Sequence, residues 1–434
     1  MDVETLSRRM VAGQLTALDL TRDCIARIQA RNPRLHAVAE LFADAAVQRA
    51  AFLDAERAAG RVLGPLHGIP VLVKELVDIA GVVTRHGSLC YGTAPAAGDA
   101  PLVARLRAAG AVILGTTHMV EFAMGSWGTN AARGTPLNPA GGARDWYAGG
   151  SSSGSAVAVA AGFVPLAVGS DTGGSVRIPA SICGVVGFKP SMGLIPIEGV
   201  APLAPTFDTI GVLARSVANI RTACAVLAGR ALPGNAPLPR RLTIATVTEA
   251  DLAPADPAVM AMMRTVLHRL GARGHRIVPA VLPRSLAALQ GLNGTIVAYE
   301  AWRAFHRQVE DSASPMDPHV RRRILAGKTI SSADYRRSMH EMAAMARAFR
   351  ESLAGIDAVL LPGTPIPAAG LETVDEAAIP LSRYTRLANC LDLCGIALPV
   401  GTTAEGAPLG IQLLAPAGQD ARLLDIAAHL PLGA

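Results

Sequence analysis

Residues 149–190 read GGSSSGSAVAVAAGFVPLAVGSDTGGSVRIPASICGVVGFKP, a stretch with two Gly/Ser clusters separated by a short apolar segment. The clusters are residues 149–155 and 169–175. Glycine lets the backbone adopt positive φ and approach a ligand closely, so the two clusters predict two tight loops that face one site. Between them, the small residues 155–161 predict a helix, and residues 164–168 predict a buried strand that leads to the second cluster.

The two loops offer different chemistry. The first opens directly into a helix N-terminus, where free N–H groups and the helix dipole favour negative charge. The second offers consecutive backbone N–H groups, from Thr172, Gly173, Gly174 and Ser175, that are suited to surround an oxyanion. The stretch therefore predicts a site that stabilises negative charge on an oxygen atom.

This pattern resembles the amidase signature family. The family's Gly-Gly-Ser-Ser-Gly-Gly-Ser run appears as Gly-Gly-Ser-Ser-Ser-Gly-Ser at 149–155. Its Gly-Thr-Asp-x-Gly-Gly-Ser-x-Arg run appears as Gly-Ser-Asp-Thr-Gly-Gly-Ser-Val-Arg at 169–177. The family's Gly-x-Pro-x-x-x-Lys-Asp segment is Gly-Ile-Pro-Val-Leu-Val-Lys-Glu at 68–75, where the final glutamate departs from the commonest form and leaves the lysine in place. The similarity covers about residues 1–220 and resumes in the last 80 residues.

The resemblance implies a role for three residues. Ser175 is similar in position to the family's nucleophile, Ser151 to its bridging serine and Lys74 to its terminal base. The spacing between Ser151 and Ser175 is the one that the family motif requires. A serine hydroxyl is a poor nucleophile until a base takes its proton, which neutral Lys74 would do through Ser151. In the family a cis peptide holds the bridging serine, and here that bond is Gly150–Ser151.

Lys74 is also unusual on composition alone. It follows three aliphatic residues in a chain that has only three lysines. Burial lowers the pKa of a lysine from about 10.4 and so makes it able to act as a base. The alternative is a structural lysine at a strand end, paired with Glu75 or Asp78.

Further residues are expected to support or line the site. Three occupy family motif positions and are expected to brace the loops: Ser152, Asp171 and Arg177. In the family, the segment that corresponds to residues 121–138 lines the acyl pocket, which makes Met124 and Trp127 candidates for substrate contact. The alternative for either residue is a packed surface loop.

Two other catalytic arrangements compete with this interpretation. Residues 150–154 match the GxSxG nucleophile elbow of α/β-hydrolases, with Ser152 at its centre. That elbow needs a strand immediately before it, whereas residues 138–150 are rich in Pro, Gly and Arg. A histidine base is also possible in principle, but histidines near Gly/Pro turns are more often structural. The histidines concerned are His67, His86 and His118.

The resemblance predicts an α/β fold with one large domain, a central twisted mixed β-sheet surrounded by helices. We expect a single domain over residues 1–434, a signature core at 60–220 and a helical cover at 256–353 that shapes the substrate entrance. Other expected helices are 2–12, 16–31, 41–60 and one from 419, and other expected strands are 71–73, 111–115, 242–248, 357–362, 396–400 and 409–414. Because the family pattern returns at the C-terminus, the sheet should take strands from both ends of the chain.

Composition limits the partners and the compartment. The net charge of +6 and the pI near 9.2 come with 37 arginines spread along the chain and no recognition motif, so we do not expect a nucleic-acid partner. The six cysteines form no CxxC pair or metal-ligand spacing, which favours reduced thiols and no metal site. The family resemblance implies a hydrolase that needs no metal or organic cofactor. Neither a signal peptide nor an apolar run of about 18 residues is apparent, so we expect a cytoplasmic protein without a membrane partner. A homodimer is compatible with the sequence.

Three functions remain, and the first is favoured. The resemblance implies an amidase that hydrolyses a small-molecule carboxamide to a carboxylate plus ammonia or an amine through a serine acyl-enzyme. The second is the glutamine-hydrolysing A subunit of a tRNA-dependent amidotransferase, which would need partner subunits. The third is a non-catalytic binding protein, against which the intact Lys74, Ser151 and Ser175 argue. The sequence does not identify the amide.

Overall fold

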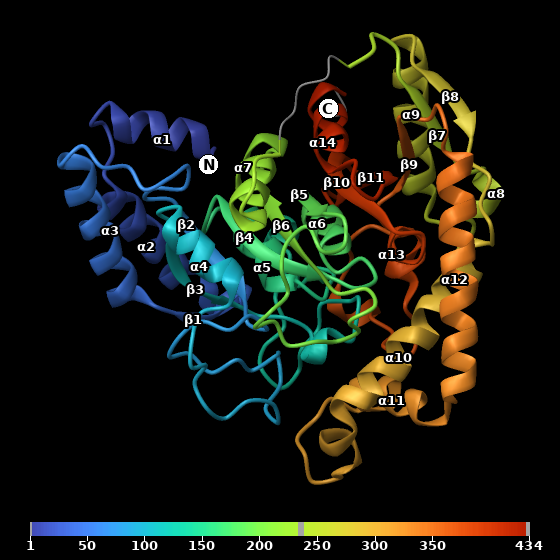
Figure 1. Cartoon of the computed structure of the whole chain (residues 1–434), viewed down its shortest axis with the longest axis horizontal. Helices are drawn as coiled ribbons and strands as arrows, with labels where there is room; N and C mark the ends of the chain where they lie inside the picture. Colours follow the sequence, from blue (N-terminus) through green and yellow to red (C-terminus); the bar gives the residue numbers. More distant parts are fainter. Residues whose placement is uncertain (1, 233–237, 431–434) are drawn as a thin grey trace.

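The computed structural model describes residues 2–232 and 238–430, which form a central sheet surrounded by helices (Figure 1). Within these residues, eleven strands make up one sheet in the order β1-β3-β2-β4-β6-β5-β10-β11-β9-β7-β8. In chain order the strands are β1 Val38–Leu41, β2 Pro70–Lys74, β3 Val112–Thr117, β4 Leu166–Asp171, β5 Val186–Lys189, β6 Thr209–Ala214, β7 Thr243–Thr246, β8 Arg276–Pro279, β9 Ala358–Pro362, β10 Leu393–Thr402 and β11 Pro408–Pro416.

Fourteen α-helices accompany the sheet in the described part of the chain. They are α1 Val3–Val11, α2 Ala17–Leu35, α3 Ala43–Ala58, α4 Pro101–Ala108, α5 Ser153–Ala160, α6 Arg177–Cys183, α7 Val217–Ala228, α8 Glu249–Leu252, α9 Pro257–Ala272, α10 Leu286–Glu310, α11 Pro318–Leu325, α12 Ser332–Ser352, α13 Arg386–Cys390 and α14 Asp420–His429. Several begin at a side-chain cap, such as Thr16, whose hydroxyl accepts from the Asp19 N–H.

The sheet is mixed, as predicted. β2 runs parallel to β3 and β4, whereas β6 is antiparallel to both β4 and β5. β10 pairs antiparallel with β5, with Ile396 opposite Phe188. Strands from the C-terminal part of the chain therefore continue the sheet that the N-terminal half begins, which confirms the prediction that both ends of the chain contribute to one sheet.

Small residues allow α5 to pack tightly against the sheet. A Cβ on Gly154 would lie 2.4 Å from the Ala37 carbonyl oxygen and 2.6 Å from that of His118. Such a contact is too close for any side chain, so only glycine permits this approach. The first turn of α5 is thereby fixed beside β2 and β4, where the candidate site residues lie.

The segment 256–353 is mainly helical but not wholly so. It contains four helices, and its two long ones, α10 and α12, lie beside the remainder of the molecule at one side of the view in Figure 1. The strand β8 also falls within it, parallel to β7 at the end of the sheet. β8 was not expected, because its four residues, Arg-Ile-Val-Pro, are exposed or half-buried and carry only a weak apolar pattern.

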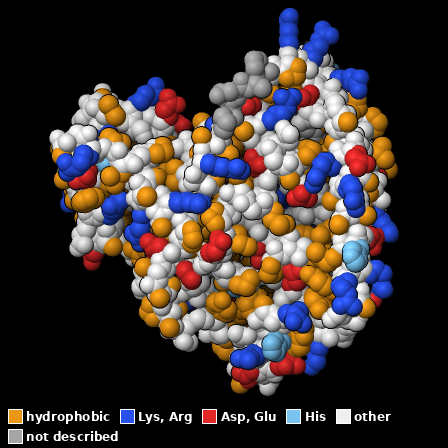
Figure 2. Space-filling view, viewed as in Figure 1, with side chains coloured by type: hydrophobic (Ala, Val, Ile, Leu, Met, Phe, Trp, Pro, Cys, Tyr) orange, Lys and Arg blue, Asp and Glu red, His pale blue; other side chains and the backbone are white. Residues whose placement is uncertain are grey.

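Two observations bear on partners. On the face shown in Figure 2, Lys and Arg side chains are interspersed with Asp and Glu. Within residues 2–232 and 238–430, no helix combines the length and the apolar character that crossing a membrane requires.

Candidate active site

Lys74 is the last residue of β2, and its amino group lies among serine hydroxyls. The side chain is fully buried. Its Nζ lies 2.8 Å from Ser151 Oγ, 3.0 Å from Ser152 Oγ and 2.9 Å from Ser170 Oγ. A lysine ammonium has three N–H donors, so these three hydroxyls use its full donor capacity.

The fold explains why these groups meet. β2 and β4 are parallel, with Val73 beside Val168, so their carboxyl ends bring Lys74 and Ser170 to the same edge of the sheet. Ser151 and Ser152 immediately precede α5, which packs on these strands. The peptide bond between Gly150 and Ser151 is cis, as the family resemblance led us to expect.

The environment of Lys74 favours its neutral, basic form. Burial lowers its pKa from 10.5 to about 7, although the carboxylates of Asp171, Asp208 and Glu75 act in the opposite direction. Desolvation dominates because the ammonium loses its water shell and no carboxylate in the described part of the chain contacts it directly. A lysine with this pKa is substantially neutral at physiological pH.

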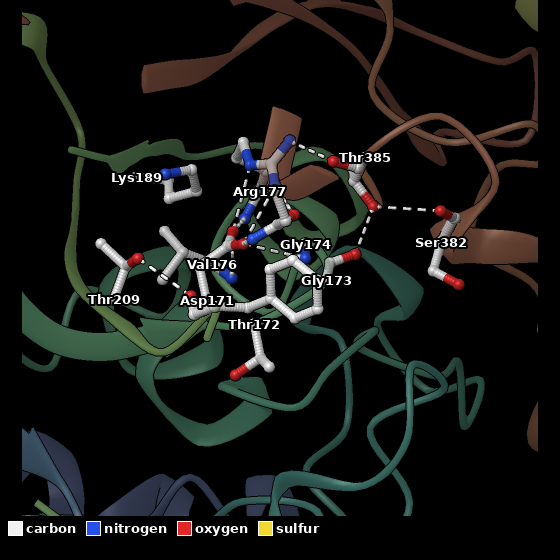
Figure 3. A network of polar contacts seen from close by, with 12 residues as sticks. Asp171, Thr172, Gly173, Gly174, Val176, Arg177, Lys189, Thr209, Ser382 and Thr385 are labelled. Carbon is white, nitrogen blue, oxygen red and sulfur yellow. Dashed lines mark hydrogen bonds and ion pairs between the residues drawn. The ribbon is translucent and has the colours of Figure 1, made fainter. Parts of the chain in front are cut away.

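Asp171 organises the loop that carries Ser175. Its carboxylate accepts hydrogen bonds from the backbone N–H groups of Gly174, at 2.9 Å, and Val176, at 3.2 Å. The Arg177 guanidinium contacts the same carboxylate through Nε, at 3.1 Å, and Nη2, at 2.9 Å (Figure 3). Burial raises the pKa of Asp171, but the charge and hydrogen bonds of Arg177 outweigh it and hold that pKa at about 2. The Asp171–Arg177 ion pair is fully buried.

Arg177 connects this loop to the C-terminal part of the chain. Its Nη1 donates to the Thr385 carbonyl and to Gln412 Oε1, each at 2.8 Å. Its Nη2 donates to Asn389 Oδ1 at 2.8 Å. In return, the Thr385 hydroxyl donates to the Gly173 carbonyl at 2.7 Å (Figure 3). The loop at 171–177 is therefore held from both directions.

The backbone donors expected for an oxyanion need one revision. The Gly174 N–H donates to Asp171 Oδ1, so it is not directed into the cavity. Thr172, Gly173 and Ser175 do line the cavity, and their N–H groups remain the candidates. The revision arises because a carboxylate two or three residues before a backbone N–H readily accepts from it in a tight turn.

The three predicted catalytic residues are only partly connected. Lys74 contacts Ser151 directly, but among the hydrogen bonds of the described residues none joins the Ser151 and Ser175 hydroxyls. The two loops meet instead through the Ser152 N–H, which donates to the Ser175 carbonyl at 3.1 Å. Hydrogen bonds between catalytic groups are often long before substrate binds and shorten in the complex.

A cavity of about 280 Å³ opens beside Ser175. Its volume approaches the range of small-molecule sites, roughly 300–1,000 Å³. It is lined by residues from distant parts of the chain, within 123–126, 172–178, 293–298, 322–326 and 376–386, and by Leu203. Ser175 faces this cavity with 8% of its surface exposed, whereas Ser151 and Ser152 are fully buried.

Comparison with known proteins agrees with this geometry. The model of the Amidase family matches residues 19–424. The chain belongs to the amidase signature family. Members of the amidase signature family hydrolyse amide C–N bonds, and the chain is an enzyme of this kind.

Individual relatives span almost the whole amidase chain. It is 34% identical to 2-amino-5-chloromuconic acid deaminase of Comamonas testosteroni, over 96% of this chain and 93% of the relative. It is 33% identical to the A subunit of glutamyl-tRNA(Gln) amidotransferase from Symbiobacterium thermophilum, over 97% of this chain and 94% of the relative. A crystal structure of an amidase superposes with a TM-score of 0.92 at 33% identity, covering 99% of this chain and 98% of the other.

Met124 and Trp127 lie in different surroundings in this amidase. Met124 lines the cavity. Trp127 instead packs in an apolar cluster with Trp146 and Tyr147, and its indole N–H donates to the Asp375 and Ala378 carbonyls. Met124 is therefore the stronger candidate for substrate contact.

The competing nucleophile and the three histidines lie away from the cavity at Ser175. The Ser152 hydroxyl donates to the Ser170 carbonyl and accepts from Lys74 and the Ser170 N–H, which fixes it away from the cavity. His67 is bonded to the Leu63 N–H and the Leu53 carbonyl. Burial lowers the pKa of His86 to about 3 and that of His118 to about 4. None of these residues lines the cavity at Ser175.

Other site residues were missed by sequence reasoning. Ser170 could have been predicted from the sequence, because it stands where the family's Gly-Thr-Asp run has its threonine hydroxyl. Asn293, Arg322, Arg323 and Arg386 line the cavity from segments that carry no motif. Their positions follow from tertiary packing, which no local pattern reveals.

Proposed function

We propose that the protein hydrolyses a small-molecule carboxamide to a carboxylate and ammonia or an amine, with Ser175 as nucleophile, Ser151 as bridging serine and Lys74 as base. The observation that supports this most strongly is the buried Lys74 Nζ, 2.8 Å from Ser151 Oγ, with its pKa lowered to about 7. A neutral amine can accept a proton from a hydroxyl, which an ammonium cannot do.

The proposed reaction has two halves. Lys74 accepts the Ser151 proton while Ser151 accepts the Ser175 proton, and the Ser175 oxygen attacks the amide carbonyl. The resulting oxyanion accepts hydrogen bonds from N–H groups of Thr172, Gly173 and Ser175, each worth roughly 3–4 kcal/mol. The proton returns through Ser151 to the nitrogen, the C–N bond breaks and ammonia or an amine leaves. Water then attacks the ester, releasing the carboxylate and restoring the Ser175 hydroxyl.

Surrounding segments have proposed supporting roles. Ser152 orients Lys74, the Asp171–Arg177 pair holds the loop of Ser175, and Met124 contacts substrate. Residues 256–353 shape the entrance, an idea supported by the cavity-lining residues between 293 and 326. The reaction requires no metal or organic cofactor in this mechanism.

A second function has a specific observation in its favour. Glutamyl-tRNA(Gln) amidotransferase A subunits are about as similar to this chain as the deaminase relative is, at 33% against 34% identity. In that case the amide would be glutamine and hydrolysis would require partner subunits. Purification of the chain alone, followed by an ammonia-release assay with glutamine, separates the two functions.

The first experiment is labelling with a small fluorophosphonate, followed by intact-mass analysis and peptide mapping. We expect one adduct on Ser175 that is absent from the Ser175→Ala variant and strongly reduced in Lys74→Ala. An adduct on Ser152 would favour the nucleophile-elbow mechanism. Absence of any adduct on a folded protein would contradict the proposed nucleophile.

A further inference from the structure

The cavity beside Ser175 carries an excess of positive charge. Three arginines line it, Arg322, Arg323 and Arg386, against one carboxylate, that of Glu376. Arg323 is paired with Glu376 at 2.6 Å, and the Thr129 hydroxyl also donates to that carboxylate. Glu376 is thus satisfied, and Arg386 forms no ion pair with any described residue.

Arg386 approaches the reactive loop closely. A Cβ on Gly173 would lie 3.4 Å from Arg386 Nε, and one on Gly294 would lie 3.2 Å from Arg386 Nη1. Gly173 precedes Ser175 by two residues, a span of at most about 7 Å. An anion bound to Arg386 is therefore only a short carbon chain from a carbonyl at Ser175.

Most N–H donors of the Arg386 guanidinium have no hydrogen-bond partner among the described residues. Its Nη1 donates to the Gln290 carbonyl at 3.0 Å, while its Nε is out of solvent contact and has no partner among the described residues. A guanidinium carries five N–H donors, so most of its capacity is unused. Burial lowers the pKa of Arg386 to about 10, and the charge of Arg323 acts in the same direction, yet the group stays cationic at neutral pH.

A buried acceptor lies next to this donor. Asn293 is 1% exposed, and its Oδ1 has no partner among the described residues, although its Nδ2 donates to the Thr172 carbonyl at 3.4 Å. A Cβ on Gly173 would be 3.2 Å from that Oδ1, so the two unpartnered atoms flank the same glycine. The ligand that satisfies both presents an anionic oxygen to Arg386 and an N–H to Asn293.

The backbone next to Arg386 is held in place before substrate arrives. The preceding residue, Thr385, is bonded to the Gly173 carbonyl through its hydroxyl and to Arg177 through its own carbonyl (Figure 3). A side chain whose backbone is already held in place has less freedom to lose on binding, which favours affinity and selectivity.

We infer that Arg386 binds a carboxylate of the substrate, so that the amide hydrolysed at Ser175 is a small amide that also carries a carboxylate group. This inference rests on the proposed function and names its substrate class. Arg386 is the residue that sets specificity, and Asn293 accepts from the amide or amine nitrogen of the same molecule.

The test compares charged and neutral amides of matched shape. One pair is glutaramic acid and glutaramide, with the charge on the acyl side, and the other is N-acetyl-β-alanine and its primary amide, with the charge on the amine side. The proteins are the wild type, Arg386→Gln, Arg386→Lys and the control Arg383→Gln. Arg383 lies three residues earlier, outside the cavity lining, and among the described residues its side chain donates only to the Pro254 carbonyl.

We expect the wild type to prefer the charged member of at least one pair. Arg386→Gln should lower kcat/KM for that compound by about 10- to 100-fold, the usual range for a charge-assisted hydrogen bond, and change kcat/KM for its neutral counterpart less than about threefold. Arg386→Lys should recover part of the loss, and Arg383→Gln should match the wild type. Equal rates on both members of both pairs, or an equal loss in Arg386→Gln on charged and neutral amides, would overturn the inference.

A binding measurement separates this inference from the catalytic proposal. Calorimetry with Ser175→Ala and glutaramic acid or N-acetyl-β-alanine needs no turnover, and binding should disappear in Ser175→Ala/Arg386→Gln. Binding that depends on Arg386 without any hydrolysis by the wild type would refute the nucleophile and leave the anion site intact. Hydrolysis of neutral amides without such binding would refute the anion site and leave the nucleophile intact.

Discussion

The lowered pKa of Lys74 predicts how the reaction depends on pH. Only the neutral amine accepts the Ser151 proton, so activity should rise with pH through about 7 and fall about tenfold per pH unit below that value. The rate of fluorophosphonate labelling of Ser175, measured between pH 5 and 9, reports this ionisation directly.

A matched control for Lys74 exists elsewhere in the chain. Lys328 is exposed and paired with Glu310, so Lys328→Met should give the same profile as the wild type. A labelling rate that is flat across pH 7 in both proteins would show that Lys74 is not the base.

Ser170 should tune that ionisation. Its hydroxyl is one of three that accept from the charged amine, and removing an acceptor disfavours the charged form. Ser170→Ala should therefore shift the fall in labelling rate on the acid side of the pH profile (the acid limb) to lower pH. It should also lower the maximum labelling rate, because Lys74 loses one of the contacts that orient it. Ser170→Thr keeps the hydroxyl and should retain the wild-type limb. A limb that shifts to higher pH in Ser170→Ala would contradict the assignment.

Some residues of the candidate site could be predicted from sequence motifs, whereas others come to the site only through tertiary structure. Lys74, Ser151 and Ser152 could be predicted together because each occupies a family motif position, and the structure places both hydroxyls within 3.0 Å of Lys74 Nζ. Arg386 could not be predicted, because it lies far along the chain from the motif loop and in a segment without a motif. Its approach to Gly173 depends on the contacts of Thr385 across the molecule.

Among the elements, the loop at 171–177 has no room for a side chain at Gly174. The φ of Gly174 is +121°, and a Cβ there would lie 2.1 Å from Thr385 Oγ1. Gly174→Ala should therefore displace the loop, abolish labelling of Ser175 and lower the melting temperature. Gly193 offers the control, because its φ is +74° but open space surrounds its Cβ position. Gly193→Ala should lower the free energy of unfolding only by the strain of a positive φ at alanine, about 1–2 kcal/mol, and should keep activity.

The ion pair that connects β4 to α6 gives the next prediction. Arg177→Met leaves Asp171 charged and buried without its partner, which typically costs about 3–5 kcal/mol in the free energy of unfolding. The exposed pair Arg264–Glu249 is the control, and Arg264→Met should cost less than about 1 kcal/mol. Urea unfolding of both variants measures the difference.

The pH dependence of that difference has a definite sign. The folded-state pKa of Asp171 is held near 2, below its ordinary 3.8, so its contribution to stability is present above pH 3.8 and is lost as pH falls towards 2. The difference in the free energy of unfolding between wild type and Arg177→Met should therefore become smaller below pH 3.8. A gap that widens there would contradict the assigned role.

Element boundaries show where sequence patterns are informative. Buried aliphatic runs predict the three C-terminal strands, and the structure extends two of them into β10 and β11. The strand β6 and the helix α6 were missed, because both are buried along their full length and lack the polar alternation that marks a half-exposed element. Their identity depends on neighbours: β6 lies between β4 and β5, and α6 packs on β10 and β11.

For the whole molecule, the order of the strands joins the motif loops to the end of the chain. β10 pairs with β5, and the acceptors of Arg177 on Thr385, Asn389 and Gln412 all lie in the C-terminal part of the sequence. The signature motifs therefore do not form an independent unit, even though most of the sequence similarity was recognised there.

This dependence predicts the behaviour of a truncated chain. A fragment of residues 1–352 loses β9, β10 and β11, which exposes the edge of β5 and leaves Arg177 without three of its acceptors. We expect it to aggregate, to lack a cooperative melt and to give no labelling of Ser175, because exposed strand edges associate and the loop of Ser175 loses its support. Co-expression with residues 353–434 should restore labelling.

Removal of residues 1–13, which takes away only the peripheral helix α1 (Figure 1), is the control and should leave a folded, labelled protein of lower stability. A monomeric 1–352 fragment that melts cooperatively and labels at Ser175 would show that the sheet is not one unit.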